Sequence, residues 1–142
     1  MEYISAEEFL KQPRKIQEEF LEYSPVKEGD LFKDISDLDV IECLDYIQND
    51  DEGMLYHSMK GNISLYDTII PLLTEGQLRK FIIGKSNNII VLTDYCDNSG
   101  YSIILNEKEG TEQKCYKYLG ADLLQAYWKV AIQIADEIIK IL

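Results

Sequence analysis

The sequence has few of the residues from which metal, nucleic-acid and membrane-surface binding sites are built. Its 142 residues include one histidine and three cysteines, and 14 lysine or arginine residues stand against 26 aspartate or glutamate residues, a net charge of −12. A protein that neutralises the phosphates of a nucleic acid carries basic patches, so direct nucleic-acid binding is disfavoured. The same shortage of positive charge argues against binding to an anionic membrane surface.

Histidine and cysteine are also poorly placed for a metal site. His57 is the only histidine, so a site built on two histidines is excluded. Cys43, Cys96 and Cys115 are odd in number and contain no C-x-x-C pair, which favours reduced, mostly buried thiols over a disulfide framework or a zinc site. No phosphate-binding glycine loop, nucleophile elbow or kinase motif is present. We therefore predict no metal and no cofactor, and a catalytic pair of carboxylates ranks last among the hypotheses.

No stretch of the sequence is suited to targeting or to crossing a membrane. The sequence starts Met1-Glu2-Tyr3, without a basic region followed by an apolar run, so a cytoplasmic protein is expected. The most apolar stretch, residues 121–142, contains Lys129, Asp136 and Glu137. A charged residue near the centre of a bilayer costs roughly 2.5–3.5 kcal/mol on insertion scales, which argues against a membrane span.

Residues 121–142 instead predict a buried helix around which the fold is built. Apolar residues recur there at steps of three and four, and a second apolar row lies beside the first: Leu124, Trp128, Ala131, Ala135, Ile138 and Leu142, with Leu123, Tyr127, Val130, Ile134 and Ile141. Such a helix needs cover over most of its circumference. The cover is a core, with an oligomer interface as the alternative, so a monomer or a small homo-oligomer is expected.

Shorter helices are indicated by caps. Ser5 and Glu8 form a capping-box pattern that predicts a helix to about residue 11, and Pro13 begins a second helix that runs to about residue 22. A further box at Thr74 and Gln77 predicts a helix that ends near Gly84.

The remaining apolar runs are short or alternate with polar residues, as strands do: residues 31–32, 40–46, 54–57, 101–106 and 113–119. Residues 62–66 are a loop or an edge strand. Residues 88–95, apolar on both alternations, predict a central strand covered on both faces. For residues 37–48 a helix that starts at Ser36 is the alternative to a hairpin. The fold class is α+β, a single domain over residues 1–142 with one core, in which an antiparallel sheet is packed by the long C-terminal helix and by two or three shorter helices.

Negative charge is concentrated in the first part of the chain. Residues 1–60 hold sixteen acids and six bases, a net charge of −10, whereas residues 61–142, with the remaining sheet and the C-terminal helix, carry −2. Complementary charge speeds encounter and excludes wrong partners. We therefore predict a protein-binding surface for a basic, nucleic-acid-binding partner, in which carboxylates imitate phosphates: Asp37, Asp39, Glu42, Asp45, Asp50, Asp51 and Glu52. A purely solubilising role for these acids is the alternative.

Tyrosine is also unusually abundant, with ten residues. Stacking on aromatic rings, aided by a few cations, suits nucleotides and other small ligands. An alternative function is therefore a small-ligand or nucleotide-sequestering protein whose pocket contains Tyr95, Tyr101, Tyr116 and Tyr118 with Arg79 and Lys80.

Four segments resemble a family of small uncharacterised proteins from phages and prophages of low-GC Gram-positive bacteria, notably clostridia. They are residues 4–10, 29–32, 72–82 and 122–131, which include both capping boxes and the start of the C-terminal helix. The resemblance implies a phage-encoded protein of the host cytoplasm and implies no activity. The acidic residues 34–51 have no counterpart in it. Together with the local charge, it predicts a non-enzymatic accessory protein that binds a host protein, as a counter-defence inhibitor does.

Overall fold

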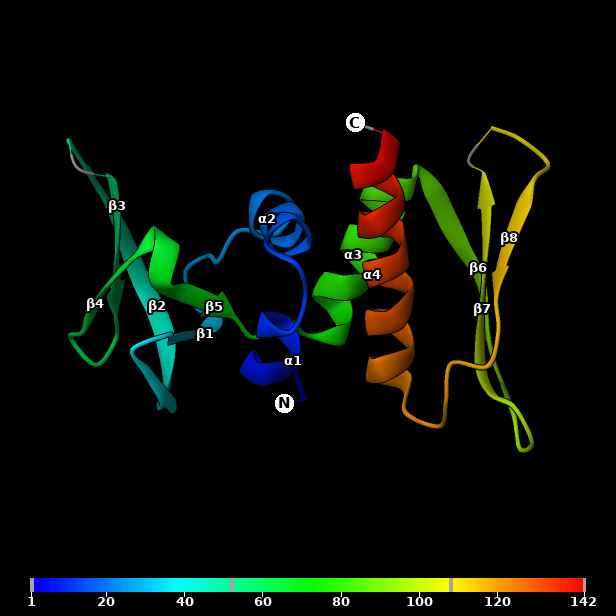
Figure 1. Cartoon of the computed structure of the whole chain (residues 1–142), viewed down its shortest axis with the longest axis horizontal. Coiled ribbons are helices and arrows are strands. Elements are labelled where there is room, and N and C mark those ends of the chain that lie inside the picture. The colour runs from blue at the N-terminus through cyan, green and yellow to red at the C-terminus, as the bar shows by residue number, and fades with distance from the viewer. Residues whose placement is uncertain (1, 52, 108, 142) are drawn as a thin grey trace.

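The chain folds into two antiparallel sheets with helices between them. The computed structural model describes residues 2–51, 53–107 and 109–141. The helices in this part of the chain are α1 (Ala6–Leu10), α2 (Arg14–Tyr23), α3 (Glu75–Ser86) and α4 (Leu123–Ile141), with one 3₁₀ turn, η1 (Tyr66–Thr68). The two sheets lie at opposite ends of the molecule, and the helices lie between them (Figure 1). The predicted α+β class is confirmed, although the strands form two sheets rather than one.

The first sheet has five strands in the order β4-β3-β2-β1-β5. Its strands are β1 (Leu31–Asp34), β2 (Asp37–Asp50), β3 (Gly53–Ser58), β4 (Ile63–Leu65) and β5 (Ile69–Pro71). The hairpin predicted within residues 40–57 is present, with Ile47 opposite Tyr56, so the alternative helix at Ser36 is wrong. The strand β2 is longer than predicted because it pairs with β1 at one end and with β3 at the other.

The second sheet is the predicted meander, in the order β6-β7-β8. It consists of β6 (Asn88–Cys96), β7 (Gly100–Glu107) and β8 (Gln113–Tyr116). The middle strand is β7, so the prediction that residues 88–95 form a central strand covered on both faces is wrong. Ile89 and Leu92 of β6 are exposed because β6 is an edge strand and only one face of this sheet is covered by helices.

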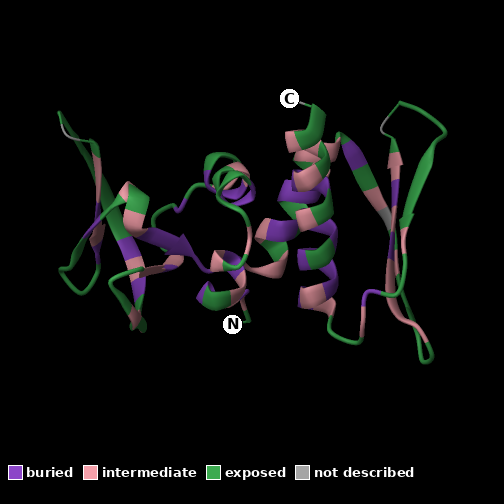
Figure 2. Ribbon diagram, in the orientation of Figure 1, coloured by how far each residue is buried: buried purple, intermediate pink, exposed green. Residues whose placement is uncertain are grey.

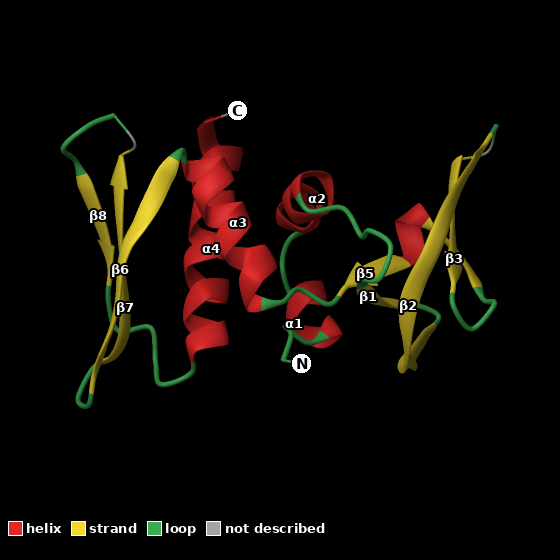
Figure 3. Cartoon of the chain, turned by 180° about the vertical axis from the view of Figure 1, so that it is seen from behind, coloured by secondary structure: helices red, strands yellow, loops and turns green. Residues whose placement is uncertain are grey.

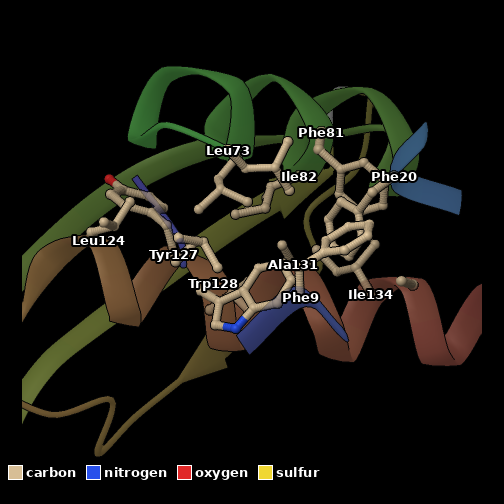
Figure 4. Close-up of a cluster of buried hydrophobic side chains, with 14 of the residues drawn as sticks. Phe9, Phe20, Leu73, Phe81, Ile82, Leu124, Tyr127, Trp128, Ala131 and Ile134 are labelled. Atoms are coloured by element: carbon tan, nitrogen blue, oxygen red, sulfur yellow. The ribbon is translucent and has the colours of Figure 1, made fainter. Parts of the chain in front are cut away.

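Two helices and one sheet cover the apolar surface of α4. On one side, the ring of Phe20 from α2 lies 4.3 Å from Phe81 of α3 and 5.2 Å from Trp128 of α4, measured between centroids (Figure 4). On the other side, Ile103 and Leu105 of β7 are fully buried in the same core cluster. Trp128 and Ile134 are 4% and 3% exposed, which confirms the predicted core helix.

A polar contact also joins α4 to the second sheet. The hydroxyl groups of Thr93 on β6 and Tyr127 on α4 are 2.7 Å apart, so the buried tyrosine hydroxyl keeps a hydrogen-bond partner. Buried tyrosines need such a partner because an unpaired hydroxyl is costly.

A second, smaller hydrophobic cluster lies under the five-stranded sheet. It contains Val26, Phe32, Leu44, Tyr56 and Ile69, with Met54 and Tyr66 packed against it. Satellite clusters of this kind form beside a main core, so the expectation of one core describes only the α4 region. Buried residues in Figure 2 accordingly occur in both regions, whereas residues 49–51 at the end of β2 are exposed.

The capping boxes differ in completeness. Thr74 Oγ1 accepts a hydrogen bond from the Gln77 N–H, and the Gln77 side chain accepts one from the Thr74 N–H. Ser5 Oγ accepts from the Glu8 N–H, but the Glu8 carboxylate accepts from Gln125 Nε2 of α4 instead of completing the box. The first cap therefore also ties the N-terminal helix to α4.

Two sequence-based details are wrong. The helix α3 continues through Gly84 to Ser86, and Asn87, with φ of 55°, ends it in the left-handed conformation. Asparagine adopts this conformation more readily than most residues. Cys96 and Cys115 are exposed and Cys43 is half-buried, so the cysteines are free, as predicted, but they are not mostly buried.

The connection from β8 to α4 requires a glycine at the start of β7. The Tyr101 N–H donates to the Gly120 carbonyl at 2.7 Å, and the Leu119 N–H donates to the Tyr101 carbonyl at 3.0 Å. Gly100 has φ of +76°, and a Cβ atom there would lie 2.4 Å from the Gly120 oxygen. No other residue type fits this approach without moving the connection.

No helix in the described ranges is both long enough and apolar enough to cross a membrane.

The α4 helix supplies a matched pair of isoleucines for a stability test. Ile134→Ala removes a side chain that is 3% exposed, whereas Ile141→Ala removes one that is 84% exposed. We expect the first substitution to lower the free energy of unfolding by about 2–5 kcal/mol and the second to change it by less than about 0.5 kcal/mol. Urea denaturation of both variants measures the difference. Equal effects would contradict the description of α4 as the core helix.

Candidate functional site

The predicted partner-binding acids lie along one strand and do not form a single patch. The strand β2 has 14 residues, and at about 3.3 Å per residue its ends are roughly 45 Å apart. Asp37, Asp39 and Glu42 lie near the β1–β2 turn, whereas Asp50 and Asp51 lie at the β2–β3 turn. Asp45 is exposed at a bulge between Leu44 and Tyr46. Glu52 lies outside the described residues.

One group of acids lines a small cavity, which we call the acidic pocket. Its volume is about 280 Å³, and it is lined by Asp34, Ser36, Asp37, Val40, Glu42, Asn62, Ile63 and Ser64. These residues come from β1, β2, β4 and the turns between the strands. Three of them are carboxylates, and two of these three, Asp37 and Glu42, were predicted site residues.

Local hydrogen bonds build the wall of the pocket formed by the β1–β2 turn. Asp34 Oδ1 accepts from the Ser36 N–H at 2.9 Å and from the Ser36 hydroxyl at 2.7 Å, an aspartate turn that reverses the chain. Asp34 Oδ2 accepts from the Thr68 hydroxyl at 3.2 Å. Burial raises the pKa of the Asp34 carboxyl, but hydrogen bonds from Ser64, Ser36 and Thr68 outweigh burial and hold the pKa below its usual range. Asp34 is therefore ionised at neutral pH although all its bonds come from neutral donors.

Glu42 is the buried carboxylate of the pocket. Its side chain lies on the inner side of β2 and is 4% exposed. Glu42 Oε1 accepts a hydrogen bond from Asn62 Nδ2 at 2.9 Å, whereas Oε2 is buried and has no hydrogen-bond partner. A buried carboxylate oxygen without a donor is unfavourable by several kcal/mol as an order of magnitude.

Among the residues that the structure describes, no cation forms an ion pair with this group of acids. Asp34, Asp37, Asp39, Glu42 and Asp45 make no salt bridge in the described part of the chain. The four ion pairs found there are Arg14–Glu18, Lys85–Glu19, Lys114–Glu137 and Lys140–Asp136. Across residues 2–51, 53–107 and 109–141, no three histidine, cysteine or carboxylate side chains converge as metal ligands.

The face of the five-stranded sheet turned away from Leu44 and Tyr56 carries exposed apolar side chains. Paired residues on neighbouring strands share a face, and Ile63, His57 and Tyr46 form one such row across β4, β3 and β2. The Tyr46 and His57 rings stack with centroids 4.3 Å apart, and Gln48 is bonded to His57 Nε2 at 2.9 Å. We call this surface the outer face; its exposed apolar residues are Ile41, Tyr46, Ile63 and Leu65.

The tyrosines predicted to line one ligand pocket lie in different places in the structure. The rings of Tyr95 and Tyr101 are 4.9 Å apart at the β6–β7 turn, but Tyr118 is 77% exposed beyond β8. Tyr116 packs against the core, where burial and then the charge of Glu137 raise its pKa.

The two cations of that prediction lie elsewhere. The Arg79 guanidinium lies over the Tyr127 ring, 5.8 Å from its centroid. Lys80 lines a groove beside α3 of about 730 Å³. Tyr95, Tyr101, Tyr116 and Tyr118 line none of four cavities found among the described residues.

Sequence reasoning missed Asp34, Asn62 and Ser64. The Asp34-Ile35-Ser36 pattern, typical of an aspartate turn, was available as a signal for Asp34. No local signal exists for Asn62 and Ser64, because they reach the pocket through the pairing of β3 with β4.

Ser64→Ala tests the account of Asp34. Loss of one hydroxyl donor should raise the pKa of the Asp34 carboxyl toward its ordinary value of 3.8. A carboxyl with a lowered pKa in the folded state stabilises the fold above its unfolded pKa, and this contribution disappears as the pH falls through the folded pKa. The stability difference between wild type and variant should therefore be greatest at neutral pH and shrink below pH 3.8.

NMR titration of the Asp34 carboxyl carbon and urea unfolding across this pH range measure both effects. Ser58→Ala, which removes another buried serine hydroxyl, should leave the Asp34 titration unchanged. An unaltered Asp34 titration in Ser64→Ala would refute the assignment.

Comparison of the chain with protein-family models, with curated protein sequences and with solved structures finds no match. The resemblance to phage and prophage proteins therefore stays a prediction.

Proposed function

We propose that this chain is a non-enzymatic accessory protein, encoded by a phage, that binds a positively charged host protein in the bacterial cytoplasm. The observation that carries the proposal is a set of carboxylates on β1 and β2 that make no salt bridge among the described residues: Asp34, Asp37, Asp39, Glu42 and Asp45. Like charges held close together destabilise a folded state. A basic partner would relieve that repulsion on binding.

The exposed outer face supplies the apolar part of the proposed interface. Protein interfaces combine an apolar, often aromatic centre with a polar rim. Tyr46 and Ile63, each more than half exposed, provide such a centre. By strand alternation Asp39 lies on the same face as Ile41, and Asp45 is exposed at the adjacent bulge. Asp39 and Asp45 therefore lie beside the apolar residues, as the polar rim of an interface does.

The kind of partner follows from the chemistry of the rim. Arginine and lysine side chains that bind phosphates also bind carboxylates through charge-assisted hydrogen bonds. A host protein that binds nucleic acid presents such side chains on its surface. Binding there would block the nucleic-acid site, which is the action expected of a counter-defence inhibitor.

The alternative of a nucleotide-sequestering protein has weaker support. Stacking requires aromatic rings around one cavity, and the four tyrosines proposed for it do not share one.

Capture from host lysate tests the proposal. The variant Asp39→Asn/Asp45→Asn/Asp51→Asn removes three exposed charges that do not line the acidic pocket. The control Asp97→Asn/Glu109→Gln/Glu112→Gln removes three exposed charges near the second sheet. We expect the first variant to bind the captured partner about tenfold more weakly and the control to bind like the wild type.

Salt provides an independent measurement. Raising the ionic strength from about 0.05 M to about 0.5 M should weaken the interaction, because surface charges are screened over a shorter distance. Absence of a specific partner at every salt concentration, or equal losses in both variants, would refute the proposed function.

A further inference from the structure

We propose that the acidic pocket binds an alkylguanidinium group. This inference rests on the proposed function for the source of the ligand: the group is an arginine side chain of the bound partner. The pocket is distinct from the exposed charges of Asp39, Asp45 and Asp51, which do not line it.

The need for a hydrogen-bond donor comes from Glu42. Its side chain is 96% buried because only 4% of its surface is exposed. Asn62 Nδ2 donates a hydrogen bond to Oε1 at 2.9 Å, whereas Oε2 has no hydrogen-bond partner. Both residues line the pocket, so a donor that binds there lies beside the buried carboxylate. Burial of an unpaired carboxylate oxygen is unfavourable unless a donor is supplied from outside the chain.

The need for positive charge comes from the surroundings of Glu42. Asp34 and Asp37 line the same pocket, and Asp37 Oδ1 accepts only a backbone bond, from the Asp39 N–H at 3.3 Å. The hydroxyl and amide donors around Asp34 are neutral. Three carboxylates with neutral donors leave an excess of negative charge, which a cationic ligand offsets better than a neutral one.

The spacing of the carboxylates favours an organic cation over a metal ion. Direct ligation needs oxygens at about 2.0–2.6 Å from one point, and the described carboxylates do not converge in this way. A cavity of about 280 Å³ is large enough for a planar group with its stem.

Guanidinium fits the pocket better than ammonium does. It carries five N–H donors in a flat fork, whereas an ammonium group is a compact, strongly hydrated charge with three donors. The wider guanidinium group matches the separated acceptors of the pocket, which are Glu42, Asp37 and the Asn62 amide oxygen. Val40 also lines the pocket and offers apolar surface to the methylene stem of an arginine.

The experiment uses the full chain and two small probes, N-acetyl-arginine methylamide and N-acetyl-lysine methylamide. Two-dimensional NMR follows the Asn62 side-chain amide and the backbone amides of residues 34–42 and 62–64 during titration. We expect the arginine probe to shift these signals and to bind more tightly than the lysine probe. Absence of shifts there at tens of millimolar, or tighter binding of the lysine probe, would overturn the inference.

Variants separate the pocket from general charge. Glu42→Gln should weaken binding of the arginine probe by about tenfold or more, because it replaces the buried charged acceptor by a neutral amide. Asp37→Asn, a change at an exposed residue, should weaken it by a smaller factor and serves if Glu42→Gln does not fold. Asp97→Asn, an equal change of net charge at the β6–β7 turn, should bind the probe like the wild type. Equal binding by wild type and Asp37→Asn would contradict a role for the pocket carboxylates.

The two proposals fail separately. If host lysate yields a partner that Glu42→Gln and Asp37→Asn bind with wild-type affinity, the pocket inference is wrong and the proposed function stands. If the arginine probe binds in the pocket but no partner is captured, the proposed function is wrong and the pocket serves a free guanidinium compound.

Discussion

The arrangement of the molecule depends on α4, a helix with apolar residues on two sides. One side packs against Phe20 of α2 and Phe81 of α3, and the other packs against Ile103 and Leu105 of β7. Helices take one side of α4 and the three-stranded sheet takes the other, and the strands before α3 do not pair with β6–β8. They form a separate sheet at the far end, as the view from behind also shows (Figure 3). In the described part of the chain, each sheet has one face toward the helices and one face that no helix or strand covers.

Local signals in the sequence predict the elements well. Thr74 and Gln77 specify the start of α3 because a capping box involves only residues three positions apart, and the spacing of Trp128 and Ile134 specifies a helix by its own period. The position of a strand within its sheet is a non-local property. Residues 88–96 are apolar on both alternations, as in a central strand, but β6 is at an edge and leaves Ile89 and Leu92 exposed. Cys96, the last residue of this strand, is exposed as well.

The candidate site is predictable only in part. Asp37 and Glu42 belong to an acidic segment that is evident from the composition of the sequence. Composition does not tell which acid of such a segment is buried and which are exposed to solvent. Glu42 is buried because strand alternation places it on the same face as Leu44, and its partner Asn62 is twenty positions away along the chain. Such a contact exists only after β2, β3 and β4 have paired. The predicted tyrosines do not form one cavity, because their positions also depend on strand pairing. The strands bring Tyr95 and Tyr101 together but leave Tyr118 beyond the sheet.

The placement of the two sheets at opposite ends (Figure 1) has an electrostatic consequence. Residues 29–71, which form the five-stranded end, include ten acids and two bases, a net charge of −8, whereas residues 88–120 include five acids and three bases, a net charge of −2. The molecule therefore has a permanent electric dipole along its long axis. In the field of a cationic surface it will rotate so that the β1–β5 end leads, before any atoms touch. Its orientation on arrival is set by the distribution of charge over the fold.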